Sequence, residues 1–192
     1  MGKLVYSMNV SLDGFVETPE HSLDWATVDE EIHSWWKDRI GEADAFLYGR
    51  RLWEVMSVWE TLEEDPASTP VMREFARIWK ATPKIVFSTS LTSVGPNARL
   101  VQGDVRDVLA QLRQEFSGDF DVGGPTLAAQ FIERGLIDEY RPVIHPVVLG
   151  GGTPFFPNLV APIGLRRTGS RMFASGTTYV GYAVDRTKEP TA

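Results

Sequence analysis

The chain has 192 residues, 43% hydrophobic and 23% charged, which is typical of a globular protein with a sizeable core. The net charge of -7 argues against a nucleic-acid-binding surface, and the absence of cysteine excludes disulfides, iron–sulfur clusters and thiolate zinc sites. Because no apolar run approaches the ~20 residues of a membrane helix and the amino terminus lacks a secretory pattern, we expect a soluble cytoplasmic protein that binds no membrane.

Strand and helix patterns alternate along the first two thirds of the chain. Thr27 and Glu30 form a capping-box pattern, Thr69-Pro70 is typical of a helix start, and Gly135 of a helix end. The expected elements are, in chain order, a strand at 4–10, a turn at 11–14, a helix over 32–40, a strand at 45–48, helices over 52–59 and 70–79, a strand at 84–89, a helix over 105–116, a strand at 120–122 and a helix over 126–134.

The last third of the chain contains only strand signals. Residues 139–149, "EYRPVIHPVVL", predict one long strand, and 165–173 with 176–184 predict a hairpin-like pair. Alternating strands and helices favour a mostly parallel sheet covered by helices on both faces. We therefore expect one α/β domain over residues 1–192, with a mostly parallel sheet finished by antiparallel strands at the carboxyl end.

Three expected strands end in residues that suit a bound anion. Gly123-Gly124 precede a helix, whose free N–H groups and dipole attract phosphate, although a tight structural turn would also need glycine. Gly49 is followed by Arg50-Arg51, and the strand at 84–89 runs into the hydroxyls of Ser88, Thr89 and Ser90. Since the carboxyl ends of parallel strands share one edge, where α/β proteins bind ligands, we expect an anion site there.

The order of these motifs makes the chain recognisable. It contains "SLDG", "YGRRLWE", "KIVFSTSL", "VGGPTLAAQFIERGLIDEY" and "HPVVLGGGTPFF". In this order they resemble the dihydrofolate reductase superfamily, and most closely the branch with the reductase domain of bacterial riboflavin biosynthesis. The resemblance spans about residues 3–185 and implies a dihydrofolate-reductase-like three-layer fold.

The resemblance also implies a cofactor, NADPH, and a homodimer, for which the apolar segment "VIHPVVL" is a candidate interface. The cofactor-binding positions that it implies are Gly49, Arg50, Arg51, Ser88, Thr89, Ser90, Gly123, Gly124, Pro125, Thr126 and Leu127. The basic neighbours of the phosphate-binding turn favour the 2′-phosphate of NADPH over the ribose of NADH.

The expected function is hydride transfer from NADPH to a small heterocycle of pteridine or aminopyrimidine type. Asp13 of "SLDG" matches the branch's substrate-side aspartate, and His33 occupies the helical position where dihydrofolate reductases carry a carboxylate. These two are the candidate catalytic residues, and Asp13, Trp36, Trp53 and Trp59 are candidate substrate contacts.

Two questions stay open from the residues alone. The run Gly150-Gly151-Gly152 either admits a ligand or allows a turn before Phe155 and Phe156. The alternative function is a non-catalytic nucleotide- or flavin-binding module on the same fold.

Overall fold

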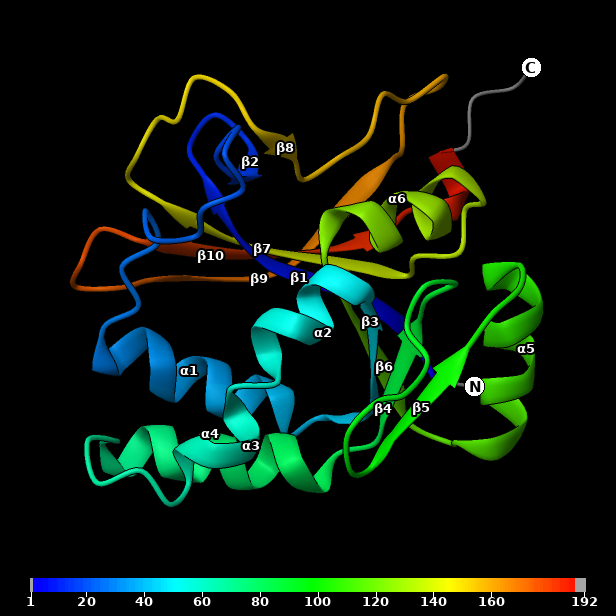
Figure 1. The fold of residues 1–192 in the computed structure, drawn as a ribbon. Coiled ribbons are helices and arrows are strands. Elements are labelled where there is room, and N and C mark those ends of the chain that lie inside the picture. The colour runs from blue at the N-terminus through cyan, green and yellow to red at the C-terminus, as the bar shows by residue number, and fades with distance from the viewer. Residues whose placement is uncertain (1, 189–192) are drawn as a thin grey trace.

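The computed structural model describes residues 2–188, and its secondary structure alternates as the sequence predicts (Figure 1). The elements are β1 (Leu4–Ser11), β2 (Phe15–Glu17), α1 (Glu30–Ile40), β3 (Ala43–Gly49), α2 (Arg50–Met56), α3 (Trp59–Leu62), α4 (Pro70–Ala81), β4 (Lys84–Phe87), β5 (Ala98–Val101), α5 (Val105–Glu115), β6 (Asp119–Gly123), α6 (Pro125–Glu133), β7 (Glu139–His145), β8 (Thr153–Pro154), β9 (Leu165–Met172), β10 (Thr178–Val184) and the 3-10 helix η1 (Arg186–Lys188).

The central sheet has eight strands in the order β5-β4-β3-β6-β1-β7-β10-β9. The strands from β5 to β7 are parallel, whereas β10 pairs antiparallel with both β7 and β9. The predicted α/β class, with a mostly parallel sheet and antiparallel strands at the carboxyl end, is confirmed. A second, two-stranded sheet joins β2 to β8.

Helices cover both faces of the central sheet. Figure 1 shows α1 and α4 side by side in the lower part of the view, α6 in the upper part and α5 at the right. The apolar residues of α5 and α6 pack with Leu4 and Tyr6 of β1 in one core cluster. A second cluster joins Trp53 and Trp79 of the helices to Phe46 of β3. Leu47 of β3 belongs to the first cluster and its neighbour Phe46 to the second, because successive residues of a strand point to opposite faces of the sheet.

Side-chain caps explain where the helices α1 and α4 begin. Thr69 accepts a hydrogen bond from the N–H of Met72, so the predicted Thr69-Pro70 start is confirmed. The capping box predicted at Thr27 and Glu30 is wrong, because Asp29 is the N-cap and accepts from the N–H of Ile32. An aspartate directly before the helix satisfies the same free N–H groups from a nearer position.

Three other expectations about the elements need correction. The helix expected over 52–59 is divided into α2 and α3, with Ser57 and Val58 between them. The short strands β2, β5 and β8 were not expected, because two to four residues show little periodicity. The long strand expected over 139–149 ends at His145, since Pro146 has no N–H to donate to a neighbouring strand.

The apolar segment that suggested a dimer interface lies partly inside the sheet, because β7 contains residues 143–145 of it. Strand β7 pairs with β1 on one side and β10 on the other, and Val143 is fully buried within the chain. The core therefore explains the apolar residues of β7, whereas Val148 beyond the strand is 66% exposed, and the homodimer stays a prediction. Within residues 2–188, no helix has the length and apolar character needed to cross a membrane.

Candidate functional site

Two adjoining cavities lie at the carboxyl ends of the parallel strands. The first has a volume of about 250 Å³ and contains Gly49 at the end of β3 and Gly124 after β6. The second has a volume of about 320 Å³ and contains Gly123. They have in common five wall residues: Met8, Val16, Leu23, Leu52 and Val55. A ligand in one cavity would therefore lie next to a ligand in the other.

Two uncapped helix starts face the first cavity. Helix α2 begins after Gly49 and α6 after Gly124, and neither of these N-cap residues supplies a side-chain hydrogen bond. The longer helices α1, α4 and α5, by contrast, are capped by Asp29, Thr69 and Asp104. Uncapped first-turn N–H groups at a helix N-terminus attract anions. The first cavity therefore has the features of an anion site.

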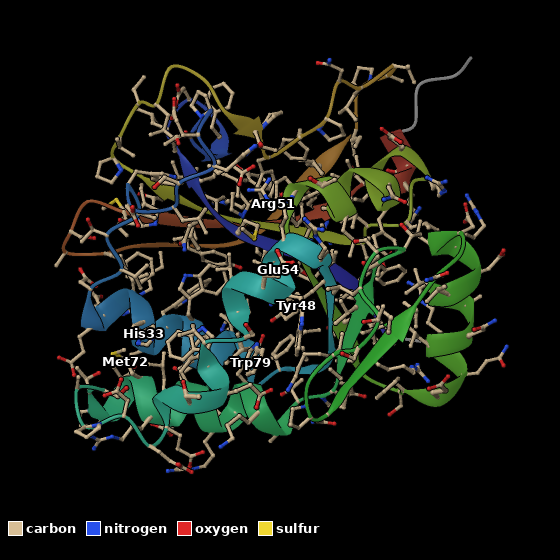
Figure 2. The ribbon with its side chains drawn as sticks, in the orientation of Figure 1. His33, Tyr48, Arg51, Glu54, Met72 and Trp79 are labelled. Carbon is tan, nitrogen blue, oxygen red and sulfur yellow. The ribbon has the colours of Figure 1, made fainter. Side chains whose placement is uncertain are left out.

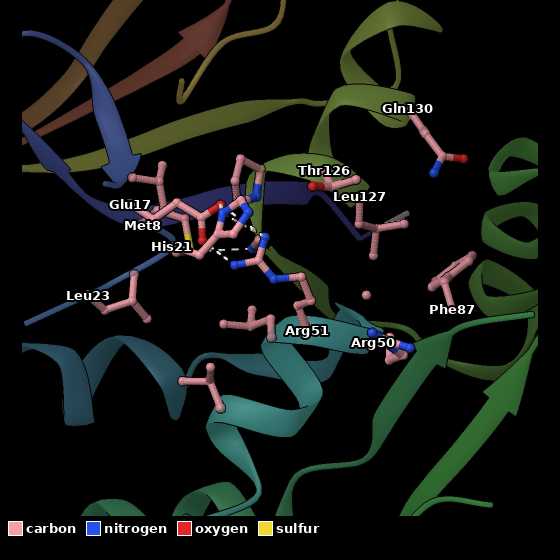
Figure 3. A pocket seen from close by; sticks show the side chains of 16 residues that line it. Met8, Glu17, His21, Leu23, Arg50, Arg51, Phe87, Thr126, Leu127 and Gln130 are labelled. Carbon is pink, nitrogen blue, oxygen red and sulfur yellow. Dashed lines mark hydrogen bonds and ion pairs between the residues drawn. The ribbon is translucent and has the colours of Figure 1, made fainter. Parts of the chain in front are cut away.

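The two arginines at the start of α2 have different partners (Figure 3). Both terminal nitrogens of Arg51 donate to the buried carboxylate of Glu17, to which the hydroxyl of Thr153 also donates. His21 Nδ1 lies 2.9 Å from Glu17 Oε1 in the same cluster. The charge of Arg51 is therefore already balanced by a carboxylate on β2, which leaves Arg50 as the more available cation.

Arg50 points toward the end of β4. Its Nη1 donates to the hydroxyl of Ser90 at 3.5 Å, and it also pairs with Glu54 at 3.4 Å. Ser88 Oγ accepts from the N–H groups of Ser90 and Leu91 and so shapes the turn. The structure thus brings Arg50 together with the 88–90 hydroxyl run, while only Phe87 of this strand end lines the cavity.

The glycines of the site serve two different purposes. Gly124 has a φ of 86°, a conformation that side chains other than glycine rarely adopt. An added Cβ at Gly123 would instead overlap the side chain of Leu52. At Gly152 it would overlap the carbonyl oxygen of Glu17. The open question about the triple-glycine run is therefore answered at Gly152 by close approach of two backbones.

Aromatic side chains line the second cavity. His33 of α1 stacks on Trp59 and Phe75, with ring centroids 5.4 and 5.1 Å apart. Burial lowers the pKa of the His33 imidazole, so this ring is uncharged at neutral pH. Trp36 also lines the cavity, and its Nε1 donates to Asn9 Oδ1 at 3.2 Å. Flat apolar walls of this kind suit a planar ligand.

Trp53 lies away from both cavities, although the sequence offered it as a substrate contact. Its side chain is buried and stacks on Trp79, with ring centroids 6.0 Å apart. Trp79 in turn donates to the hydroxyl of Tyr48 at 3.2 Å, and Figure 2 shows these two residues beside each other. Trp53 is therefore part of the core on this face of the sheet.

Asp13 is held by the loop after β7. Its carboxylate accepts from Ser11 Oγ at 2.7 Å and from the N–H groups of Leu149 and Gly150 at 3.1 and 2.7 Å. The hydrogen bond from Ser11, followed by those from the two backbone N–H groups, lowers the pKa of Asp13. Asp13 is exposed and is absent from the described lining of both cavities.

Asp121 is a site residue that the sequence analysis missed. It lines the second cavity from β6 and accepts from Ser7 Oγ at 2.7 Å. Burial raises its pKa to about 7, against the opposing effects of the Ser7 hydrogen bond and of Arg141. The feature of the sequence that could have pointed to Asp121 is a single carboxylate between the apolar Phe120 and Val122 of a central strand.

Comparisons with known proteins find one family model and a curated relative that match most of the chain. The family model described as "RibD C-terminal domain" matches residues 2–179. The uncharacterized protein YyaP of Bacillus subtilis (strain 168) is 29% identical over 181 residues, which cover 94% of each chain.

Two solved structures have a similar fold. A putative riboflavin biosynthesis protein from Shewanella sp. PV-4 has a TM-score of 0.75 at 22% identity, covering 96% of this chain and 99% of the other. Dihydrofolate reductase from Enterococcus faecalis, complexed with NADP(H), has a TM-score of 0.65 at 14% identity, covering 96% and 97%. At these identities the likeness shows the fold alone, and it confirms the expected dihydrofolate-reductase-like architecture.

Proposed function

Because the chain belongs to the RibD C-terminal domain family, we propose that it is a reductase that transfers a hydride from NADPH to a small planar heterocycle. The observation that carries this proposal is the pair of adjoining cavities, one with anion-binding features and one with aromatic walls. Because five residues line both cavities, a cofactor in the first cavity would lie next to a substrate in the second. Hydride transfer requires such direct contact between donor and acceptor carbons.

The residues around the first cavity fit a dinucleotide cofactor. The N-termini of α2 and α6 would present N–H groups to the pyrophosphate, and the positive φ of Gly124 forms the turn into α6. Arg50 with Ser88 and Ser90 would bind the additional 2′-phosphate of NADPH, because a cation and hydroxyl donors suit an anionic group. The remaining proposed cofactor contacts are Gly49, Arg51, Thr89, Gly123, Pro125, Thr126 and Leu127.

The chain's own residues would do little covalent chemistry. NADPH supplies the hydride when it is bound. Trp36 and Trp59 would hold the substrate ring flat, and the apolar wall formed by Leu23 and Val55 would exclude water from the transfer. We infer a substrate of pteridine or ribosylaminopyrimidine type, because such rings are planar and carry polar edges. Asp13 would act indirectly, by fixing the 149–150 loop.

NADPH titration tests the first half of the proposal. We expect quenching of tryptophan fluorescence and a calorimetric signal with NADPH, both weakened when Arg50→Ala removes the cation beside Ser90. Arg99→Ala is a matched control, because Arg99 is an exposed arginine on the edge strand β5 that pairs with Glu115. Absence of any signal from the unaltered protein would refute cofactor binding.

An oxidation assay tests the second half. NADPH consumption is measured with dihydrofolate, with a dihydropterin and with the ribosylaminopyrimidine of the riboflavin pathway. Turnover of one of them is the expected result. Binding of NADPH without turnover of any candidate would favour the alternative of a non-catalytic module, and a yellow protein on purification would favour a flavin-binding one.

A further inference from the structure

We propose that Asp121 is the proton donor of the second cavity, and that it protonates the substrate nitrogen or oxygen next to the carbon that receives the hydride. This inference rests on the proposed function and names the acid for its reaction. The substrate carbon of a C=N or C=O bond accepts the hydride, and the π electron pair moves to the nitrogen or oxygen. That atom takes the carboxyl proton of Asp121, and the resulting carboxylate is reprotonated from water.

The position of Asp121 supports this role. Strand β6 places its side chain on the face that also bears Gly123, and both residues line the second cavity. The next residue, Gly124, already lines the first cavity. Asp121 therefore lies in the proposed substrate cavity, on the strand whose end also reaches the proposed cofactor cavity. Among the described residues lining the second cavity, it is the only carboxylate.

Charges on neighbouring elements leave Asp121 without a strong cationic partner. The guanidinium of Arg141 on β7 lowers the pKa of Asp121, but Arg141 is paired with Glu139 at 2.8 Å and with Glu42 at 3.3 Å. Arg39 of α1 also lines the cavity, and it pairs with Glu42 at 2.9 Å. Two carboxylates thus balance these arginines, and burial dominates the protonation of Asp121.

The resulting protonation state suits a general acid. Burial raises the pKa of Asp121 to about 7, the Ser7 hydrogen bond and Arg141 lower it, and Glu42 raises it. A group with a pKa near the working pH is the most effective acid, because it is partly protonated and still releases its proton readily. A free aspartate, with a pKa of about 3.9, would be ionised and unable to donate.

Two other titratable groups in the cavity are poorer donors. The imidazole of His33 is uncharged at neutral pH, because burial lowers its pKa, and it is enclosed by Trp59 and Phe75. Burial raises the pKa of Tyr48 far above its usual range, and its hydroxyl is engaged by Trp79. Neither group matches Asp121 as an acid.

The experiment measures the pH dependence of turnover with whichever of the three substrates above is reduced. In the unaltered protein, kcat should fall as pH rises through the pKa of the donor, because the carboxylate has no proton to give. Asp121→Asn should lower kcat by about 10²- to 10⁴-fold and abolish this dependence. The control is Asp119→Asn, two residues earlier on β6. This variant should keep the kcat and the pH dependence of the unaltered protein, because Asp119 accepts from the N–H of Lys3 outside the cavities.

Two further variants distinguish a proton donor from a merely structural carboxyl. Removing the Ser7 hydroxyl in Ser7→Ala should shift the pH midpoint upward, and Glu42→Gln should shift it downward. The same opposite shifts should appear in an infrared titration of the Asp121 carboxyl without substrate. Circular dichroism checks that each variant is folded.

The outcomes separate this inference from the proposed function. If the unaltered protein reduces none of the three substrates, the proposed function fails and this inference with it. If the unaltered protein turns over but Asp121→Asn retains its kcat within about twofold, or retains the pH dependence, the assignment of Asp121 alone is overturned.

Discussion

Replacing Glu17 with glutamine should destabilise the fold in a pH-dependent way. The Glu17 side chain is only 8% exposed, and its carboxylate connects β2 to Arg51 of α2 and to Thr153 of β8. Glutamine keeps the shape but loses the charge, and its amide nitrogen cannot accept a hydrogen bond. The variant therefore loses part of a charge-assisted network that joins three segments far apart in the sequence.

The expected loss is about 2 kcal/mol at neutral pH. A hydrogen bond to a charged group contributes about 1.5–3 kcal/mol, and glutamine keeps some of these bonds through its carbonyl oxygen. Arg51 is 49% exposed, so water solvates its guanidinium when the carboxylate is removed, and the cost stays below that of a fully buried unpaired charge. For a chain of this length, 2 kcal/mol corresponds to a decrease in Tm of about 4–8 °C.

The pH dependence follows from the pKa of Glu17. Burial alone would raise this pKa, but the hydrogen bonds from Arg51, Thr153 and His21 outweigh it and lower the pKa. A lowered carboxyl pKa stabilises the fold above the unfolded value of about 4.3, and this stabilisation is lost as pH falls through the folded value. The difference in Tm should therefore be full at neutral pH and should shrink in acid, as pH falls below the unfolded value of about 4.3.

Thermal unfolding, followed by circular dichroism, measures the difference in Tm between the variant and the unaltered protein at neutral and at acidic pH. Glu20→Gln is the matched control, because Glu20 is an exposed carboxylate in the same segment, and its Tm should match that of the unaltered protein. A decrease in Tm of equal size at both pH values would refute the role of the charge. An unchanged Tm at neutral pH would refute the network itself.

Three more changes give specific outcomes. Gly124→Ala, at a φ of 86°, should cost about 1–2 kcal/mol in chemical denaturation and weaken NADPH binding in calorimetry. Gly152→Ala, whose Cβ would overlap the carbonyl of Glu17, should cost more than Gly124→Ala in the same denaturation experiment. Trp79→Phe should lower the free energy of unfolding by about 1–3 kcal/mol, because it leaves the buried Tyr48 hydroxyl unpaired. A double-mutant cycle with Tyr48→Phe should show a coupling energy of about 1 kcal/mol.

The sequence alone determined the architecture, because that information is local. Hydrophobic periodicity identified strands and helices, and their alternation up to residue 134 favoured a mostly parallel sheet. The helix start at Thr69-Pro70 depends on neighbouring residues, and the structure confirms it. Since parallel strands end at one edge, the sequence also brought Gly49 and Gly124 together correctly around one cavity.

Only the tertiary structure decided which charges meet. Arg51 looked available for a phosphate, but Glu17, 34 residues away, forms an ion pair with it after β2 packs beside α2. Asp121 was not among the expected site residues, and the fold places it in the second cavity beside Ser7 of β1. The protonation and availability of a side chain depend on distant segments that surround it, and no local pattern encodes those neighbours.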